Sequence, residues 1–409
     1  MSIDRKLPVY LFFLLVLVIL LFQSFHPSWF AQSSTDVYVY SSRASYFLSH
    51  FNLTELDYNE YLPGAVLFFI SVIPTLLISN RFEPYLLGFM TVNVVLLFII
   101  AYIYQKFGKI ENVAVFSLIL LFTGPIIFFR FELLVVLLVL LSFYFWSKHR
   151  YIKSAIFLGL GTLVKLYPIL FLPYFLILKY KTDRIKGVLQ FGLVYILTVI
   201  ILTIFYLLIF KVPFANLQQS LNFHSMKPVN TESIWADILT FTSTLTTGHF
   251  PTMISAWGIN GLDPKFWFLP LWFYNWIWVL PIGLMYLWFI FKIRKKEAKF
   301  DNKFCIAIIL LFLIFSKVLP HQYLLWFMLL IPLIDIKILI SREWTINLFI
   351  VLITTFIHQY IYPLNYSQFL SGFSNPTEAM HLFTINRIAH ILLIVLFIRL
   401  MFEIKKDYR

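Results

Sequence analysis

Long apolar stretches, separated by short polar turns, run along almost the whole chain of 409 residues. A helix needs roughly 20 apolar residues to cross a bilayer, and helices satisfy their own backbone groups in lipid. The pattern therefore predicts an all-α, polytopic transmembrane helical bundle that forms one integral domain over residues 1–409. We expect about ten spans: Leu7–Phe25, Pro84–Tyr104, Val113–Phe129, Phe131–Trp146, Gly187–Phe210, Phe266–Phe291, Phe304–Phe315, Tyr323–Ile334, Trp344–Tyr360 and Ile388–Phe402.

The charged residues give this bundle an orientation. Only 12% of the residues are charged, against roughly 25% in soluble domains, and the net charge is +13. If Leu7–Phe25 enters from the cytoplasm, most of the 32 Lys and Arg residues fall on the cytoplasmic side, as the positive-inside rule describes. This predicts a multi-pass membrane protein with both termini in the cytoplasm. It also explains the basic charge through the lipid bilayer, without a nucleic-acid partner.

The first apolar stretch has an alternative interpretation as a signal peptide. Its apolar run is long and no small-x-small cleavage site follows, which favours a membrane anchor.

Two other apolar stretches cannot cross without placing basic loops on the wrong side, so we expect both to be re-entrant. Ser154–Leu178 has basic residues at each end and is interrupted at Lys165-Leu166-Tyr167-Pro168, where proline disrupts a helix. Two half-helices that enter and return fit this pattern best. Pro63–Ser79 has the same difficulty on the outer side.

With this topology, the remaining polar residues gather on the outer face, mainly in outer catalytic loops at about residues 26–62 and 211–265. Ionisable groups at membrane depth are costly and mark functional sites by default. We therefore expect a site for a polar, anionic substrate. Its candidate residues are Asp36, Tyr40, Arg43, Glu60, Tyr61, Arg130, Glu132, Lys165, His224, Lys227, Glu232, Lys317, His321 and Gln322.

Several of these residues stand in motifs that resemble the GT-C superfamily of integral-membrane glycosyltransferases, especially the mannosyltransferases that use polyprenyl-phosphate mannose. The motifs follow one another in the family's order, although Leu62, Glu132 and Lys227 stand where the family often has Pro, Asp and Arg. They are Thr35-Asp36-Val37-Tyr38, Glu60-Tyr61-Leu62-Pro63, Arg130-Phe131-Glu132, Gly159-Leu160-Gly161 with Lys165-Leu166-Tyr167-Pro168, Lys227 with Glu232-Ser233-Ile234-Trp235, and Pro320-His321-Gln322-Tyr323-Leu324-Leu325-Trp326.

The resemblance implies a hexosyltransferase that inverts the sugar configuration and works on the extracytoplasmic face. Its donor would be a polyprenyl-phosphate-linked sugar, with mannose expected, and its acceptor a lipid-linked or other glycan. Asp36 would then be the catalytic base that deprotonates the acceptor hydroxyl, and Arg130, Lys165, Lys227, Lys317 and His321 would be candidates for the lipid phosphate. The resemblance implies no cofactor and no metal.

Each assignment has a structural alternative. Asp36 could be an N-cap, Arg130 and Glu132 a local ion pair, and Lys165 a side chain that reaches toward lipid headgroups. Glu232 could cap or pair locally, and His224 and His321 could be satisfied in polar loops.

Two other functions stay open. A transporter or lipid flippase would also show broken helices and buried ionisable residues, but no internal repeat relates the two halves of the chain. An oligosaccharide polymerase or ligase of the same superfamily is the second, although its outer loop should be longer than Lys211–Lys265.

Overall fold

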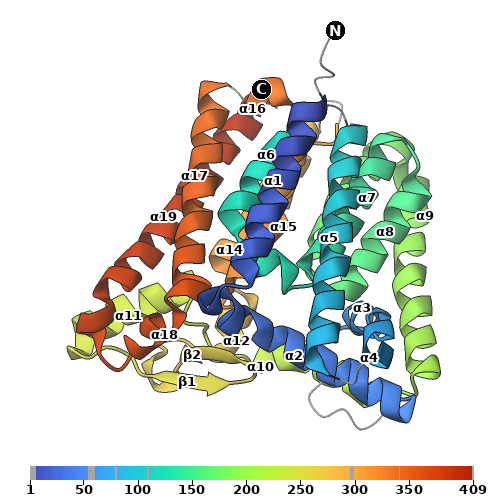
Figure 1. Ribbon diagram of the computed structural model, residues 1–409. Coiled ribbons are helices and arrows are strands. Elements are labelled where there is room, and N and C mark those ends of the chain that lie inside the picture. Colours follow the sequence, from blue (N-terminus) through green and yellow to red (C-terminus); the bar gives the residue numbers. More distant parts are fainter. Residues whose placement is uncertain are drawn as a thin grey trace. The chain divides into compact units, whose positions relative to one another are not determined.

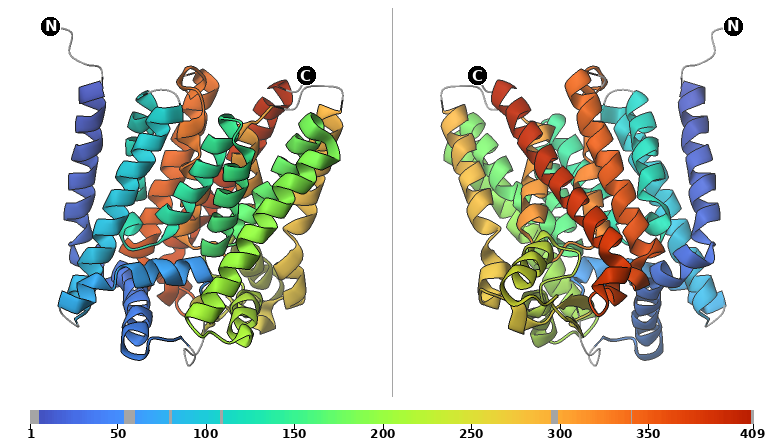
Figure 2. Two further views of the ribbon diagram at one scale, coloured as in Figure 1. Left: turned by 90° about the vertical axis from the view of Figure 1, so that its right-hand side faces the viewer. Right: turned by 90° about the vertical axis from the view of Figure 1, so that its left-hand side faces the viewer.

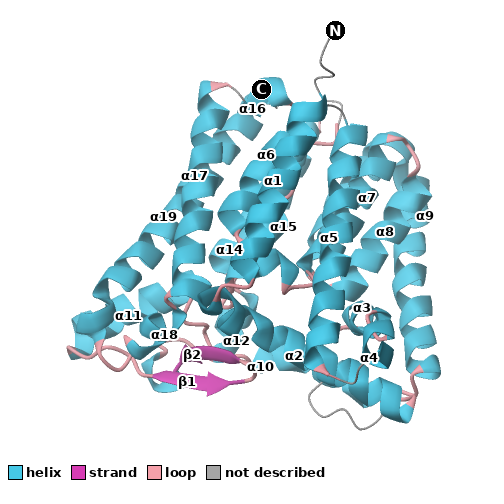
Figure 3. Ribbon diagram, in the orientation of Figure 1, coloured by secondary structure: helices cyan, strands magenta, loops and turns pink. Residues whose placement is uncertain are grey.

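A computed structural model of the chain describes residues 6–53, 60–78, 81–107, 110–294, 299–339 and 341–407. Helices account for most of these residues, and the described strands are limited to one short hairpin (Figures 1 and 3). The predicted all-α fold is therefore confirmed. The described chain divides into two compact units, residues 6–221 with 299–300 and residues 222–294 with 301–407, and each is considered separately.

The first unit contains the N-terminal helices. Its elements are α1 (Lys6–Ser24), α2 (Pro27–His50), α3 (Pro63–Ser71), α4 (Pro74–Ile78), α5 (Phe82–Phe107), α6 (Glu111–Thr123), the 3-10 helix η1 (Pro125–Phe128), α7 (Glu132–Ser147), α8 (Tyr151–Val164), the 3-10 helix η2 (Tyr167–Phe171) and α9 (Leu172–Ile209). Helix α10 (Phe214–Met226) runs across the boundary between the units.

In this unit α8 packs against both α7 and α9, and α5 packs against α7, while α9 lies at the outer edge (Figure 1). Short α3 also packs on α8 at a glycine. A Cβ atom on Gly64 would lie 2.8 Å from the backbone carbon of Leu163. Only a residue without a side chain allows the two backbones to approach this closely.

The predicted break within Ser154–Leu178 is confirmed. Helix α8 ends at Val164, Lys165 has extended backbone angles, and the chain continues through η2, which has Pro168 near its start. Helix α9 then has a second interruption at Arg184, whose backbone is non-helical. Pro63–Ser79 likewise forms two short helices, α3 and α4, in its described part. That these segments enter and leave the membrane on one side stays a prediction.

Two predicted boundaries differ from the structure for clear reasons. The stretch Val113–Phe129 is not one helix, because Gly124 has φ of 73° and is followed by Pro125, which ends α6 at Thr123. The segment that contains Asp36 is helical from Pro27, which occupies the first turn after the N-cap residue His26. The alternative that Asp36 is an N-cap is therefore wrong.

The second unit contains the C-terminal helices and the hairpin. Its elements are α11 (Ile234–Thr247), β1 (Met253–Ala256), β2 (Ile259–Leu262), η3 (Pro264–Phe266), α12 (Leu271–Trp276), α13 (Val279–Ile293), α14 (Asn302–Phe315), η4 (His321–Leu324), α15 (Leu325–Met328), η5 (Ile331–Leu333), α16 (Ile336–Leu339), α17 (Arg342–Gln359), the π-helical turn η6 (Tyr360–Leu364), α18 (Tyr366–Ser371) and α19 (Pro376–Asp407).

Helices α17 and α19 pack along each other in this unit (Figure 2). An apolar cluster that includes Leu239, Leu262, Phe369 and Phe383 joins α11, the hairpin, α18 and α19. The hairpin pairs β1 and β2 in antiparallel fashion, and Gly261 lets it approach the segment before α11, since a Cβ there would lie 2.5 Å from Pro228. This close packing fixes the loop that carries Glu232.

Five described helical segments are long and apolar enough to cross a membrane. They are Lys6–Ser24, Phe82–Phe107, Tyr167–Ile209, Leu271–Ile293 and Arg342–Leu364. Six shorter apolar segments accompany them, among them Asn302–Phe315 and His321–Leu333, which the sequence also predicts to be short. The chain is therefore a membrane protein; its ten crossings, its orientation and its single domain stay predictions.

We predict that Gly64→Ala destabilises the first unit, because the new methyl group would overlap the backbone at Leu163. Such overpacking typically costs about 1–3 kcal/mol, which a lower midpoint of thermal unfolding in detergent would show. Gly283→Ala is the matched control, because a Cβ at Gly283 of α13 meets nothing within 4 Å. Equal midpoints for the two variants would contradict the close contact at Gly64.

Candidate functional site

Helix α2 presents three of the candidate residues on one face. Tyr40 lies about one helical turn after Asp36, and Arg43 lies about two turns after Asp36. Tyr40 and Arg43 are buried, whereas 38% of the Asp36 side chain is exposed. On this face of α2 the Asp36 carboxylate is therefore accessible to solvent, whereas the Tyr40 and Arg43 side chains are buried.

Arg130 fixes the position of the Asp36 carboxylate. Its Nε lies 3.2 Å from Asp36 Oδ2, and its Nη1 donates to the backbone oxygens of Ser33 at 2.9 Å and Phe129 at 3.0 Å. Because the guanidinium is buried and has several donors in one plane, it is held rigidly at the carboxylate.

Glu132 and Lys165 form a second ion pair in this unit. The carboxylate is at the first residue of α7, and Lys165 reaches it from the break after α8. The ammonium also lies over the Phe131 ring, 4.9 Å from its centre. Lys165 therefore points to a buried carboxylate, so the alternative that it reaches toward lipid headgroups is wrong. Arg130 and Glu132 each pair with a residue distant in the sequence, rather than serving only as a local pair.

Aromatic rings pack around the Asp36 helix face. Tyr40 stacks on Phe69 with ring centres 4.2 Å apart, and its ring lies edge-on to Tyr61 at 5.6 Å. The Arg43 guanidinium covers Tyr61 at 4.9 Å. Burial raises the pKa of Tyr40 and of Tyr61 well above the usual value, and the carboxylates of Asp36 and Glu60 respectively raise it further. Both phenols therefore stay protonated and serve as donors.

Glu232 is the centre of the second group of candidates. Its Oε2 lies 2.7 Å from His321 Nδ1, and its Oε1 accepts a hydrogen bond of 2.9 Å from Tyr366. The N-cap of α11 is Ser233, whose hydroxyl accepts from the Ala236 amide. Glu232 therefore pairs with residues distant in the sequence, and the alternative of a local cap is wrong.

Two residues that the sequence analysis missed support Glu232 from α19 and α11. His390 places Nδ1 2.5 Å from Asp237 Oδ2 and Nε2 3.0 Å from the Glu232 carbonyl oxygen. A third buried imidazole, His358 of α17, has its ring centre 4.9 Å from His321 and 6.0 Å from His390. The sequence did contain a signal, because ionisable residues within apolar stretches are rare.

Two lysines lie in loops of the second unit, Lys317 before η4 and Lys227 before α11. Lys317 Nζ donates to the carbonyl oxygens of Ser225, at 2.9 Å, and Lys227. Burial, together with the nearby Lys227 cation, lowers the pKa of Lys317 to about 7. Lys227 itself is buried with its ammonium 5.0 Å from the centre of the Phe223 ring. The Lys317 ammonium is therefore present below about pH 7 and lost above it.

The remaining candidates are half-buried. His224 lies in α10 beside Phe223, and Gln322 follows His321 in η4. The candidates thus form one group around Asp36, Glu60, Arg130 and Glu132 in the first unit and another around Glu232, Lys317 and His321 in the second. The convergence of the two groups on a single face stays a prediction, as do the roles of all these residues.

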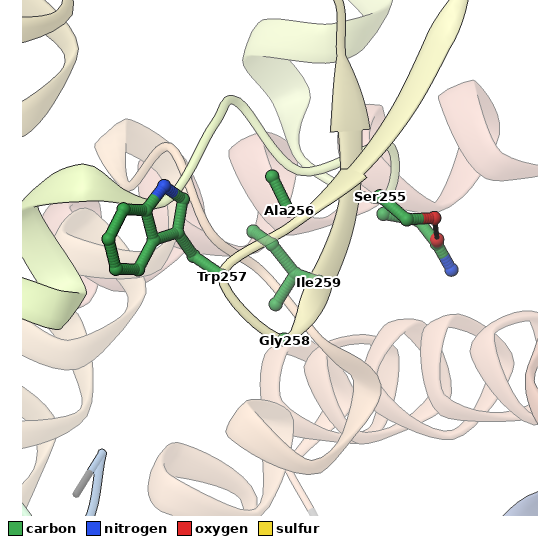
Figure 4. Close-up of a pocket in the computed structure, with 6 residues that line it drawn as sticks. Ser255, Ala256, Trp257, Gly258 and Ile259 are labelled. Carbon is green, nitrogen blue, oxygen red and sulfur yellow. Dashed lines mark hydrogen bonds between the residues drawn. The ribbon is translucent and has the colours of Figure 1, made fainter. Parts of the chain in front are cut away.

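The turn of the β1–β2 hairpin surrounds a pocket of about 270 Å³, lined by Ser255, Ala256, Trp257, Gly258, Ile259 and Asn260 (Figure 4). None of these residues is ionisable, and the Ser255 hydroxyl already donates to Asn260 Oδ1 at 2.6 Å. The pocket therefore lacks a group for acid–base chemistry.

No cluster of three or more His, Cys, Asp or Glu side chains suited to a metal ion occurs within the described ranges.

The protein is therefore a helical membrane protein whose polar site contains buried ion pairs at the ends and breaks of apolar helices. Residues 60–316 match the profile of Glycosyltransferase family 87, which is more than half of the chain. The protein belongs to this family and is a glycosyltransferase, which confirms the resemblance to the GT-C enzymes. The matched range includes Arg130, Glu132, Lys165 and Glu232 but not Asp36 or His321. No curated protein matches the chain significantly.

We predict that Lys165→Met destabilises the protein by about 3–5 kcal/mol, because it leaves the Glu132 carboxylate buried without its cation. Thermal unfolding in detergent measures this loss. The double variant Lys165→Met/Glu132→Leu should recover much of it, since it removes both charges. Lys406→Met, which removes an exposed partner of Glu403, is the control and should leave the midpoint unchanged. A double variant no more stable than Lys165→Met would contradict charge compensation as the cause.

Proposed function

We propose that this glycosyltransferase moves a sugar, with mannose expected, from a polyprenyl-phosphate donor to a lipid-linked or other glycan acceptor, with inversion at the anomeric carbon. We further propose that it works on the extracytoplasmic face of a prokaryotic membrane. Membership of family 87 and the order of the GT-C-like motifs support this proposal.

The observation that carries the proposal is that the Asp36 carboxylate is both accessible and held in a fixed position. This carboxylate is partly exposed while a buried arginine at 3.2 Å holds it in place. A general base needs this combination, because it must reach the hydroxyl that it deprotonates and yet keep one orientation. Glu132, by contrast, is closed off by burial and by Lys165.

In the proposed reaction, Asp36 takes the proton of the acceptor hydroxyl as that oxygen attacks the anomeric carbon. The bond between this carbon and the phosphate oxygen breaks on the opposite face, and the phosphate leaves with the electron pair. Since phosphate is a good leaving group, charge stabilisation replaces a general acid. The neutral phenols of Tyr40 and Tyr61 and the Arg43 guanidinium are suited to orient sugar hydroxyls.

The lipid phosphate requires cations near the leaving oxygen. In the second unit, Lys227 and Lys317 supply two ammonium groups close together, and a dianion would relieve their mutual repulsion. His321 with Glu232, and His224 and Gln322 nearby, are proposed as further substrate contacts in that unit.

We predict that Asp36→Asn lowers the transfer rate by about 10²–10⁴-fold, because the amide keeps the shape of the side chain but cannot accept the proton. The measurement is transfer of radiolabelled sugar from polyprenyl-phosphate mannose to membrane acceptors by purified protein in liposomes. Asp263→Asn, which changes a carboxylate paired with Lys265 beside the hairpin, is the control and should retain activity.

The comparison of Asp36→Asn with the parent protein has three informative outcomes. Loss of transfer in a folded Asp36→Asn variant supports the base. Absence of transfer from every lipid-linked sugar tested, with a variant that behaves as the parent does, would overturn both the proposed donor and the role of Asp36 as base. Transfer from other polyprenyl-phosphate sugars but not from mannose would correct the sugar alone.

We also predict that affinity for the donor falls as the pH rises above 7. Lys317 has a pKa of about 7, so its ammonium is present below this pH and is lost above it. The apparent KM for the donor should rise between pH 6 and 8.5, and Lys317→Arg should flatten this rise, because arginine stays charged. The same pH dependence in both proteins would show that Lys317 does not bind the phosphate.

A further inference from the structure

The two ring nitrogens of His321 have different surroundings. Nδ1 lies 2.7 Å from Glu232 Oε2, although neither these two atoms nor Nε2 makes a hydrogen bond among the residues that the structure describes. Both side chains are only 5% exposed. With the proton of a neutral His321 on Nδ1, the lone pair of that nitrogen is not placed against the carboxylate oxygen, so the short distance favours this tautomer. Nε2 is then a buried acceptor without a donor.

Glu232 is itself held by donors from other parts of the chain. Tyr366 donates to its Oε1 at 2.9 Å and receives a hydrogen bond of 3.3 Å from Asn260 of the hairpin. Burial and the Glu232 charge raise the pKa of Tyr366, so the phenol remains a donor. This hydrogen bond leaves Oε2 as the carboxylate oxygen that faces His321.

The backbone of Glu232 is held by His390. The His390 nitrogens face two acceptors, Asp237 Oδ2 at 2.5 Å and the Glu232 carbonyl oxygen at 3.0 Å. Arg387 Nε lies 3.9 Å from Asp237 Oδ1. A carbonyl oxygen only accepts, so Nε2 of His390 donates to Glu232, and the ring ties α19 and α11 to the loop before α11.

We infer that Tyr366 and the His390–Asp237 pair are positioning residues, which hold Glu232 so that it fixes His321 with its proton on Nδ1 and presents Nε2 to a hydroxyl group of the substrate. This inference rests on the proposed substrate contact of His321. It assigns His321 to a sugar or acceptor hydroxyl instead of the lipid phosphate. A carboxylate that orients an imidazole through Nδ1 is the arrangement by which Nε2 becomes a proton acceptor in hydrolases.

The first test reads the nitrogen protonation of His321 directly, without any transfer activity. Protein labelled with ¹⁵N-histidine in nanodiscs should give a protonated Nδ1 and an unprotonated Nε2 for His321, assigned by loss of the signals in His321→Gln. Glu232→Gln should move the proton to Nε2, because the Gln amide can donate to Nδ1. A wild-type His321 with its proton on Nε2, or with both nitrogens protonated, would overturn the inference.

The second test separates positioning from a general structural role. Tyr366→Phe and Asp237→Asn should lower kcat/KM about 10-fold or more, by analogy with the loss seen when groups that orient metal-ligating histidines are removed, and should broaden or shift the His321 signals. Tyr360→Phe removes a hydroxyl from the neighbouring η6 segment and should change neither. Lower activity and lower thermal stability with unchanged His321 signals would assign the two residues to folding only.

The two measurements also keep this inference apart from the proposed function. The expected nitrogen signals without any sugar transfer would refute the proposed function while the fixed tautomer stands. Transfer with the other tautomer would refute this inference alone.

Discussion

The ion pair between Glu132 and Lys165 is the interaction on which the first unit depends most. The Glu132 carboxylate is at the start of α7, and the Lys165 ammonium comes from the residue that follows α8. The pair therefore links these two helices at the end away from their connecting turn. An unpaired charge at this depth costs several kcal/mol, which restricts the chain to arrangements in which α8 stops at Val164. The Gly64 contact with α8 at Leu163 then places α3 beside the same break.

The break itself was predictable from the sequence, whereas the pairing was not. Pro168 cannot continue a helix, and this local rule located the interruption between α8 and α9. The partners of Arg130 and Glu132 depend instead on which helices become neighbours in space. Their charges are two residues apart, which suggested a local pair, yet Asp36 and Lys165 come from other helices. The helical content and the apolar stretches followed from composition because lipid leaves few alternatives.

The network behind Glu232 shows a second limit. Motif resemblance indicated Glu232 and His321 but not Tyr366, His390 or Asp237, because these three contribute through α18, α19 and α11, which no motif connects. His390 stands in an apolar stretch, where an ionisable side chain requires a partner. That rule marks such residues for attention, although only the folded chain shows that His390 binds both Asp237 and the Glu232 backbone.

The carboxylates of Asp36, Glu132 and Glu232 differ in burial, and burial limits the role that each of them can have. Glu132 is 1% exposed and Glu232 4% exposed, and each has a fixed cationic or hydrogen-bonding partner. Such groups are suited to orient other residues, because a change in their charge would leave the partner uncompensated. The Asp36 side chain, at 38% exposure, is accessible to another molecule while Arg130 keeps it in position. This difference in exposure is the reason that we propose Asp36, and neither Glu132 nor Glu232, as the base.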